Sequence, residues 1–131
     1  MRSRGKLLFL LTLVFICCVL PGCQKPPGIA KVVDVIDGDT IVIEGGYHVR
    51  YIGIDSPEKD EPFYSEAKRI NEDLVEGKVV ELQKDISDQD KHGRMLRYIY
   101  IDDIFVNAEI VRLGYANSNA YPPDIKYQIF L

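Results

Sequence analysis

The fold of this chain is decided by residues 29–54, which read IAKVVDVIDGDTIVIEGGYHVRYIGI. Three apolar runs rich in β-branched residues predict strands at residues 29–36, 40–44 and 47–54. The pairs Asp37-Gly38 and Gly45-Gly46 separate these runs, and such pairs favour the tight turns that join antiparallel strands. The stretch therefore predicts an antiparallel meander of three strands.

A helix is predicted directly after the meander. Ala67, Ile70 and Leu74 recur at helical spacing. Ser65 stands where an N-cap residue is expected, and Gly77 stands where a helix would end. We therefore expect one helix between the third strand and the next.

Two further strands are predicted at residues 79–82 and 95–101, and a short return strand at 104–106. Asn107 is expected to cap a second helix that Gly114 ends. Five strands with a helix between the third and the fourth favour an α+β architecture. Its centre would be a small, partly open β-barrel of the oligonucleotide- and oligosaccharide-binding (OB) kind.

The N-terminal segment is predicted to be a signal peptide. Arg2, Arg4 and Lys6 precede an apolar run over residues 7–20, which is shorter than the roughly 20 residues that span a bilayer. The run ends in Leu20-Pro21-Gly22-Cys23, which resembles a bacterial lipobox with Cys23 as the lipidated residue. Secretion after ordinary cleavage and a short, uncleaved membrane anchor are the alternatives.

This pattern divides the chain into a signal peptide (1–23), a tether (24–28) and one domain (29–131). All three cysteines lie at or before Cys23, so the domain has neither a disulfide nor a thiolate zinc site. The formal net charge of the whole chain is −4. Removing the three positive charges of Arg2, Arg4 and Lys6 leaves a net charge of −7 for the remainder. Such an acidic domain is unsuited to coating nucleic acid through long-range attraction.

Three short motifs carry the candidate chemistry: residues 37–40 (DGDT), 50–58 (RYIGIDSPE) and 90–94 (DKHGR). Carboxylates bind hard cations and guanidinium groups bind phosphate oxygens in pairs, so the set suits metal-assisted attack on a phosphodiester. Each motif also has a structural explanation. DGDT alone is usually a hairpin turn, and the acids of residues 85–90 are most simply those of a solvated loop.

One geometric condition follows from the spacing of Arg50 and Asp55. Along a straight strand they would lie roughly 16 Å apart at about 3.3 Å per residue. They can share one phosphate only if the chain bends between them, and Gly53 is the expected place for that bend.

The order of these motifs, followed by Val106-Asn107 and Ile110-Val111-Arg112 before Gly114, resembles the staphylococcal nuclease family over about residues 30–116. The resemblance implies a five-stranded barrel that hydrolyses DNA and RNA with Ca²⁺. The candidate site residues carried over by matching positions are Asp39, Asp55 and the Ser56 carbonyl as calcium ligands, Glu58 as the residue that activates water, Arg50 and Arg94 as phosphate ligands that stabilise the transition state, and Lys91 as a ligand of a terminal phosphate.

Two departures from the family pattern stand out. His92 occupies the position of a tyrosine, and the residues after Pro123 are fewer than the long C-terminal helix of the family requires, so that helix is expected to be truncated. The predicted function is a monomeric, exported, membrane-tethered calcium-dependent nuclease. The alternatives are a non-catalytic nucleic-acid-binding module and an inactive, truncated remnant of the fold.

Overall fold

A computed structural model of the chain describes residues 28–131. The predicted signal peptide, its lipidation site Cys23 and the tether up to residue 27 lie outside the described residues. Within the part that is described, no helix has the length and apolar character needed to cross a bilayer.

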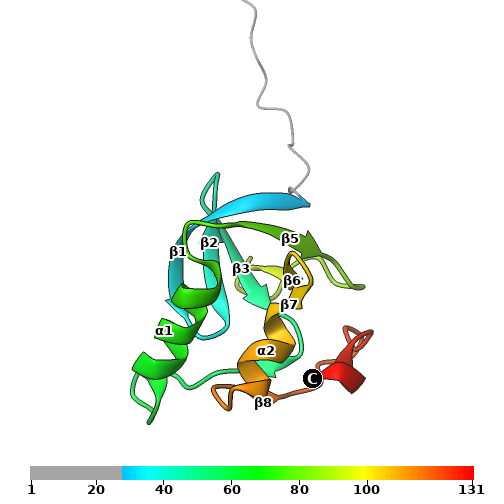
Figure 1. Cartoon of the computed structure of the whole chain (residues 1–131). Helices are drawn as coiled ribbons and strands as arrows, with labels where there is room; N and C mark the ends of the chain where they lie inside the picture. Colours follow the sequence, from blue (N-terminus) through cyan, green and yellow to red (C-terminus); the bar gives the residue numbers. More distant parts are fainter. Residues whose placement is uncertain (1–27) are drawn as a thin grey trace, which may run out of the picture.

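The centre of the fold is a closed five-stranded barrel (Figure 1). Its strands are β1 (Ile29–Asp37), β2 (Thr40–Ile43), β3 (Tyr47–Tyr51), β5 (Val79–Gln83) and β6 (Met95–Ile101). They pair in the order β3-β2-β1-β5-β6, and a parallel pairing of β3 with β6 closes the barrel. The predicted OB-type barrel with helices is therefore confirmed.

Three short strands lie outside the barrel order. β7 (Ile104–Phe105) extends the sheet beside β6, as the predicted return strand requires. β4 (Ile54–Asp55) pairs with β8 (Asn117–Ser118) in a separate two-stranded sheet that the sequence did not predict.

Two helices flank the barrel, and both begin earlier than predicted (Figure 1). α1 spans Tyr64–Val75, and its N-cap is Phe63 in a left-handed conformation with φ of 66°. The prediction that Ser65 caps this helix is wrong, because Ser65 lies inside it. α2 spans Val106–Arg112, so Asn107 also lies inside its helix and does not cap it.

The core fills the barrel and the space beneath the two helices. β-branched residues dominate it because they suit the pleated inner faces of the strands. Its fully buried members include Val32, Val35, Ile41, Ile43, Val49, Ile54, Val75, Ile99 and Ile110. This core fixes the strands that carry the candidate site.

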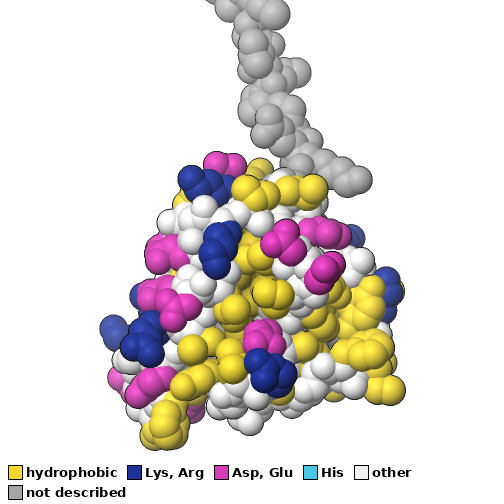
Figure 2. Space-filling model, in the orientation of Figure 1, with side chains coloured by type: hydrophobic (Ala, Val, Ile, Leu, Met, Phe, Trp, Pro, Cys, Tyr) yellow, Lys and Arg dark blue, Asp and Glu magenta, His cyan; other side chains and the backbone are white. Residues whose placement is uncertain are grey.

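After α2 the chain passes through β8 and ends in a 3-10 turn, Gln128–Phe130, beside the barrel (Figure 1). Ile129 and Phe130 are exposed there. On the face drawn in Figure 2, apolar side chains gather toward this C-terminal part, while charges of both signs are spread over the rest.

Candidate active site

Two carboxylates and one guanidinium meet where the turn between β1 and β2 lies beside the bend that follows β3. Arg50 Nη2 lies 3.2 Å from Asp39 Oδ2 and 3.1 Å from Asp55 Oδ1. Asp39 is 4% exposed and the Arg50 side chain 12% exposed, so this contact lies largely out of water. Three residues from two of the motifs therefore converge, as the sequence predicted.

The convergence depends on a sharp bend after β3. Gly53 has φ of +80°, a conformation that side chains disfavour, and the predicted bend at this residue is confirmed. The Arg50 guanidinium spans the bend, since Nη1 donates hydrogen bonds of 2.9 Å to the carbonyls of both Tyr51 and Ile54. The pairing of β4 with β8 holds the far side of the bend.

Asp39 is fixed by hydrogen bonds to both of its oxygens. The Thr40 hydroxyl donates to Oδ1 at 3.0 Å, and the backbone N–H of Ser56 donates to Oδ2 at 2.8 Å. Ser56 is thus placed beside Asp39, while the predicted use of its carbonyl stays a prediction. Burial, together with the neighbouring Asp39 carboxylate, raises the pKa of Asp37 to about 6.

Two buried asparagines tie this end of the barrel to the helices. Asn71 of α1 accepts a hydrogen bond from the Tyr51 hydroxyl at 2.8 Å and donates to the Asp37 carbonyl at 2.9 Å. Asn107 of α2 accepts from the backbone N–H of Ile99 and donates to the Ile52 carbonyl, both at 2.9 Å. One asparagine therefore holds the turn before Asp39 and the other holds the bend after Arg50.

Arg94 lies on the loop that precedes β6, where Asp90 orients it. Asp90 Oδ2 accepts from Arg94 Nε at 2.6 Å, and Oδ1 accepts from the backbone N–H groups of His92 and Arg94. Burial raises the pKa of Asp90, but these hydrogen bonds outweigh it and leave the pKa below its ordinary value. The carboxylate therefore stays ionised and keeps the Arg94 side chain in one position.

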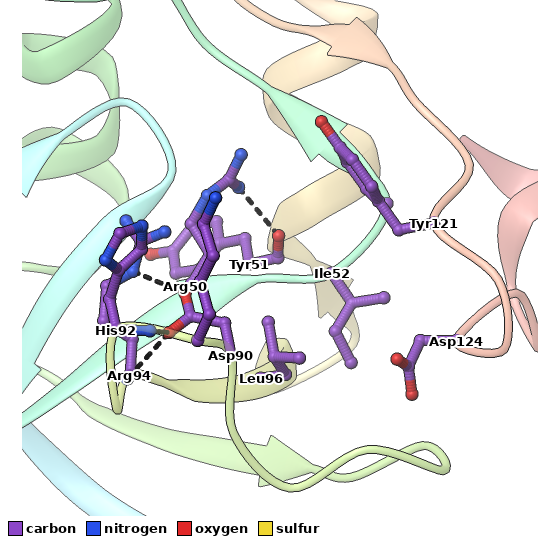
Figure 3. Close-up of a pocket in the computed structure, with 11 residues that line it drawn as sticks. Arg50, Tyr51, Ile52, Asp90, His92, Arg94, Leu96, Tyr121 and Asp124 are labelled. Atoms are coloured by element: carbon purple, nitrogen blue, oxygen red, sulfur yellow. Dashed lines mark hydrogen bonds and ion pairs between the residues drawn. The ribbon is translucent and has the colours of Figure 1, made fainter.

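Arg50 and Arg94 share a hollow of about 460 Å³ (Figure 3). Figure 3 shows Arg50, His92 and Arg94 on one side of it, with Tyr121 and Asp124 from the C-terminal segment on the other. Its lining residues are Arg50, Tyr51, Ile52, Gly53, Asp90, Lys91, His92, Arg94, Leu96, Tyr121 and Asp124. The predicted substrate ligand Lys91 is among them, so three predicted site residues face one cavity.

Glu58 is the one predicted catalytic residue that does not lie beside the hollow of Arg50 and Arg94. It lies in the exposed loop after β4 and does not line the hollow. Within residues 28–131 its carboxylate makes no hydrogen bond or ion pair, while its backbone N–H donates to Glu61 Oε2 at 2.8 Å. The water-activating role of Glu58 stays a prediction.

The donor set at Asp39 and Asp55 fits a hard cation. Asp39 Oδ2 and Asp55 Oδ1 both lie within 3.2 Å of Arg50 Nη2, so the two carboxylates are close enough to act on one positive centre, which in this structure is the guanidinium. Among the described residues no cluster of three or more His, Cys, Asp or Glu side chains is present. An ion held here would therefore complete its shell with backbone carbonyls and water, as Ca²⁺ commonly does.

Several residues of the site escaped the sequence analysis. The acids of residues 85–90 were expected to be solvated, but Asp85 accepts from the Tyr98 hydroxyl and Asp88 from Arg97. Asp124 accepts from the backbone N–H groups of Ile86 and Ser87, which holds the C-terminal segment against the same loop. No short-range pattern signals such partners, because they lie 9 to 38 residues apart in the chain.

Comparisons with known proteins agree with this geometry. The family model described as "Staphylococcal nuclease homologue" matches residues 48–131. A thermonuclease of Staphylococcus intermedius is 34% identical over 106 residues, which cover 74% of this chain and 63% of that protein. Endonuclease YncB of Bacillus subtilis (strain 168) is 37% identical over 103 residues, covering 70% of this chain and 49% of that protein.

An uncharacterized endonuclease of Haemophilus influenzae is 33% identical over 120 residues, which cover 88% of this chain and 65% of that protein. The chain thus spans about half to two thirds of the length of these relatives. The match begins within β3 and includes Arg50, Asp55, Lys91 and Arg94. From this match, together with the barrel, we conclude that the chain belongs to the staphylococcal nuclease family.

Proposed function

We propose that this protein is a calcium-dependent nuclease that hydrolyses phosphodiester bonds of DNA and RNA. The observation that carries the proposal is the position of Arg50. Its guanidinium lies beside the carboxylates of Asp39 and Asp55, and it also lines the hollow that contains Arg94 and Lys91.

The chemistry of phosphodiester hydrolysis requires such an arrangement. The five-coordinate transition state carries more negative charge than the substrate, and preorganised donors aimed at that charge are usually the largest catalytic term. Arg50 and Arg94 supply two guanidinium groups from opposite sides of the β3–β6 seam. A guanidinium fork can donate to two phosphate oxygens, which an ammonium group cannot reproduce. Both Nη atoms of Arg50 contact protein oxygens in this structure, so a phosphate bound through them would replace some of those contacts.

Calcium would be held by Asp39, Asp55 and the carbonyl of Ser56, with water completing the shell. A bound cation of this kind would polarise a phosphate oxygen and lower the pKa of a coordinated water. The two aspartates lie beside Arg50, so the residues that would hold the ion and a residue that would bind the phosphate are neighbours.

Glu58 is proposed to take the proton of the attacking water. A glutamate of ordinary pKa near 4.3 is a weak base, so the water must be made more acidic by a neighbouring cation. Glu58 follows Asp55 by three residues, on the exposed loop that leaves β4. We expect this loop to bring the carboxylate toward the hollow when substrate is present.

We also propose that the protein is exported and tethered to the bacterial membrane through a lipid on Cys23, and that it acts as a monomer. The tether would leave the domain free to meet nucleic acid outside the cell. Replacing Cys23 by alanine should release the protein from the membrane fraction, as fractionation of expressing cells would measure. Retention of the variant in the membrane would contradict the lipid anchor.

The catalytic proposal is tested by incubating the purified domain with single-stranded DNA and with RNA. Cleavage is expected with Ca²⁺, and it should stop when a chelator is added or when Glu58 is replaced by alanine. Glu66→Ala is the matched control, because Glu66 is an exposed acid on α1. Cleavage that survives both the chelator and Glu58→Ala would refute this mechanism, and binding without any cleavage would favour a non-catalytic module.

A further inference from the structure

A second hollow lies next to the one that contains Arg50. Its volume is also about 460 Å³. It is lined by Gly46, Tyr47, His48, His92, Gly93 and Arg94. His92 and Arg94 line both hollows, so the two cavities share a wall and a ligand in one lies beside a ligand in the other.

The strand register explains why His48 faces this site. Successive side chains of β3 alternate between the barrel core and the outer face, and Val49 and Tyr51 are buried. His48 and Arg50 therefore share the other face, about 7 Å apart along the strand. In the parallel pairing of β3 with β6, Val49 lies opposite Met95. His48 and Arg94 each come one residue earlier, so the same register places them side by side.

The second hollow is well suited to an anion. Its lining residues include His48, His92 and Arg94, and no acidic residue of the described chain lines it. Asp90 pairs with Arg94 through Nε, which leaves the two Nη groups of Arg94 to donate to a ligand. Imidazole and guanidinium N–H groups donate to phosphate oxygens. His48 and His92 are both exposed, so a ligand can reach them from solvent.

We infer that this hollow is a second phosphate subsite for a nucleic-acid strand, with His48, His92 and Arg94 as its ligands. The inference rests on the proposed nuclease function and deepens it. A strand whose cleaved phosphate lies at Arg50 continues past Arg94, and its next phosphate lies in the second hollow. The one-pleat step from Arg50 to His48 is comparable to the spacing of consecutive phosphates in an extended single strand.

The test measures how affinity depends on the length of the ligand. Fluorescently labelled single-stranded oligothymidylates of two to six nucleotides are titrated with the protein, and fluorescence anisotropy is recorded with a chelator present to prevent cleavage. Affinity should rise when the strand is long enough to occupy both hollows. His48→Ala should reduce that gain by roughly fivefold or more, the size expected for a lost hydrogen bond to a charged group.

Two further variants separate a specific contact from a general loss of charge or fold. His48→Gln keeps an N–H donor and should retain most of the gain. Arg112→Ala removes an exposed cation that lines neither hollow, so the length dependence should match the parent protein.

Each outcome decides the proposal separately from the nuclease assay. The second subsite is overturned if affinity rises with oligonucleotide length equally in the parent and in His48→Ala. It is also overturned if affinity does not depend on oligonucleotide length. If DNA and RNA are not cleaved but the length-dependent gain is lost in His48→Ala, the subsite stands and the proposed catalytic function falls.

Discussion

The two halves of the candidate site differ in how the fold holds them. The carboxylate end, which we define as Asp39, Arg50 and Asp55, is centred on Arg50 of barrel strand β3, with Asp39 in the turn between β1 and β2 and Asp55 at the end of β4. Arg50 has four polar partners there, and its side chain is 12% exposed. The cationic loop, defined as residues 90–94, lies before β6. Its Arg94 has a single carboxylate partner and a side chain that is 33% exposed.

Because the two halves differ in burial, a mutation should affect stability and activity together in one half and activity alone in the other. At the carboxylate end, loss of the Arg50 side chain leaves the buried Asp39 carboxylate and two carbonyls without this partner, so both stability and activity should fall. On the cationic loop, water can replace the hydrogen bonds of a lost side chain, so activity should fall while the free energy of unfolding stays nearly the same. Each prediction below tests one side of this comparison.

The largest effect is expected for Arg50→Lys. Lysine keeps the charge but loses the planar fork, which donates to both carbonyls of the bend and contacts Asp39 and Asp55. We expect kcat/KM for single-stranded DNA to fall about 10²- to 10³-fold, the cost of removing a preorganised donor, and the free energy of unfolding to fall by about 2 kcal/mol. Initial rates and urea unfolding measure the two effects.

Arg112→Lys is the matched control, since Arg112 pairs with Glu109 on the surface of α2. It should leave both quantities near those of the parent. An Arg50→Lys protein that retains more than about a tenth of the parent activity would show that the fork is not essential.

Arg94→Lys should affect activity but not stability. The interaction of Nε with Asp90 is lost, and the phosphate contact becomes that of a single ammonium group. We expect kcat/KM to fall about 10- to 100-fold, while the free energy of unfolding changes by less than about 0.5 kcal/mol. A loss of stability as large as that of Arg50→Lys would remove the distinction between the two halves.

The sequence predicted the parts of the fold that depend on local patterns. The turn pairs Asp37-Gly38 and Gly45-Gly46 and the β-branched runs beside them gave β1 and β2 to within one residue. The third strand was predicted at residues 47–54, but β3 ends at Tyr51 because the chain bends at Gly53 before β4. The bend at Gly53 was also predictable, because Arg50 and Asp55 could meet only if the chain turned between them. These features are set within a few neighbouring residues.

The parts that depend on tertiary structure were not predictable. Ser65 and Asn107 matched the preferences of cap residues, but packing extends both helices past them. The Asn107 side chain instead joins β6 to the bend, over separations of 8 and 55 residues. The pairing of β4 with β8 involves two residues from each strand, which is too short for any periodic signal.

Asn107→Ala tests how the carboxylate end depends on the helix behind it. The substitution leaves the N–H of Ile99 and the carbonyl of Ile52 without their partner in a buried place. We expect the free energy of unfolding to fall by about 2 kcal/mol. Urea unfolding measures it, with Asn119→Ala as the control, because Asn119 is exposed and its side chain donates a hydrogen bond to the Tyr121 hydroxyl, which is also accessible to water. Equal stabilities of the two variants would contradict a structural role for Asn107.

The smallest effect concerns Asp37, at the edge of the carboxylate end. Its pKa is raised from the ordinary 3.8 to about 6, so the folded domain binds this proton more tightly than the unfolded chain does. The contribution of Asp37 to stability is therefore most favourable below pH 4, and it is lost as the pH rises from about 4 to about 6. Asparagine resembles the protonated acid and can still accept the N–H of Asp39.

Asp37→Asn should therefore stabilise the domain at pH 7 by about 1 kcal/mol, a value reduced for the partial exposure of the carboxyl group. The gain should vanish at pH 4, where the natural residue is itself largely protonated. Urea unfolding at both pH values, with a chelator present, measures the difference, and Asp60→Asn on the exposed loop is the control. A gain of the same size at pH 4 and pH 7 would mean that charge repulsion and burial at Asp37 are not its cause.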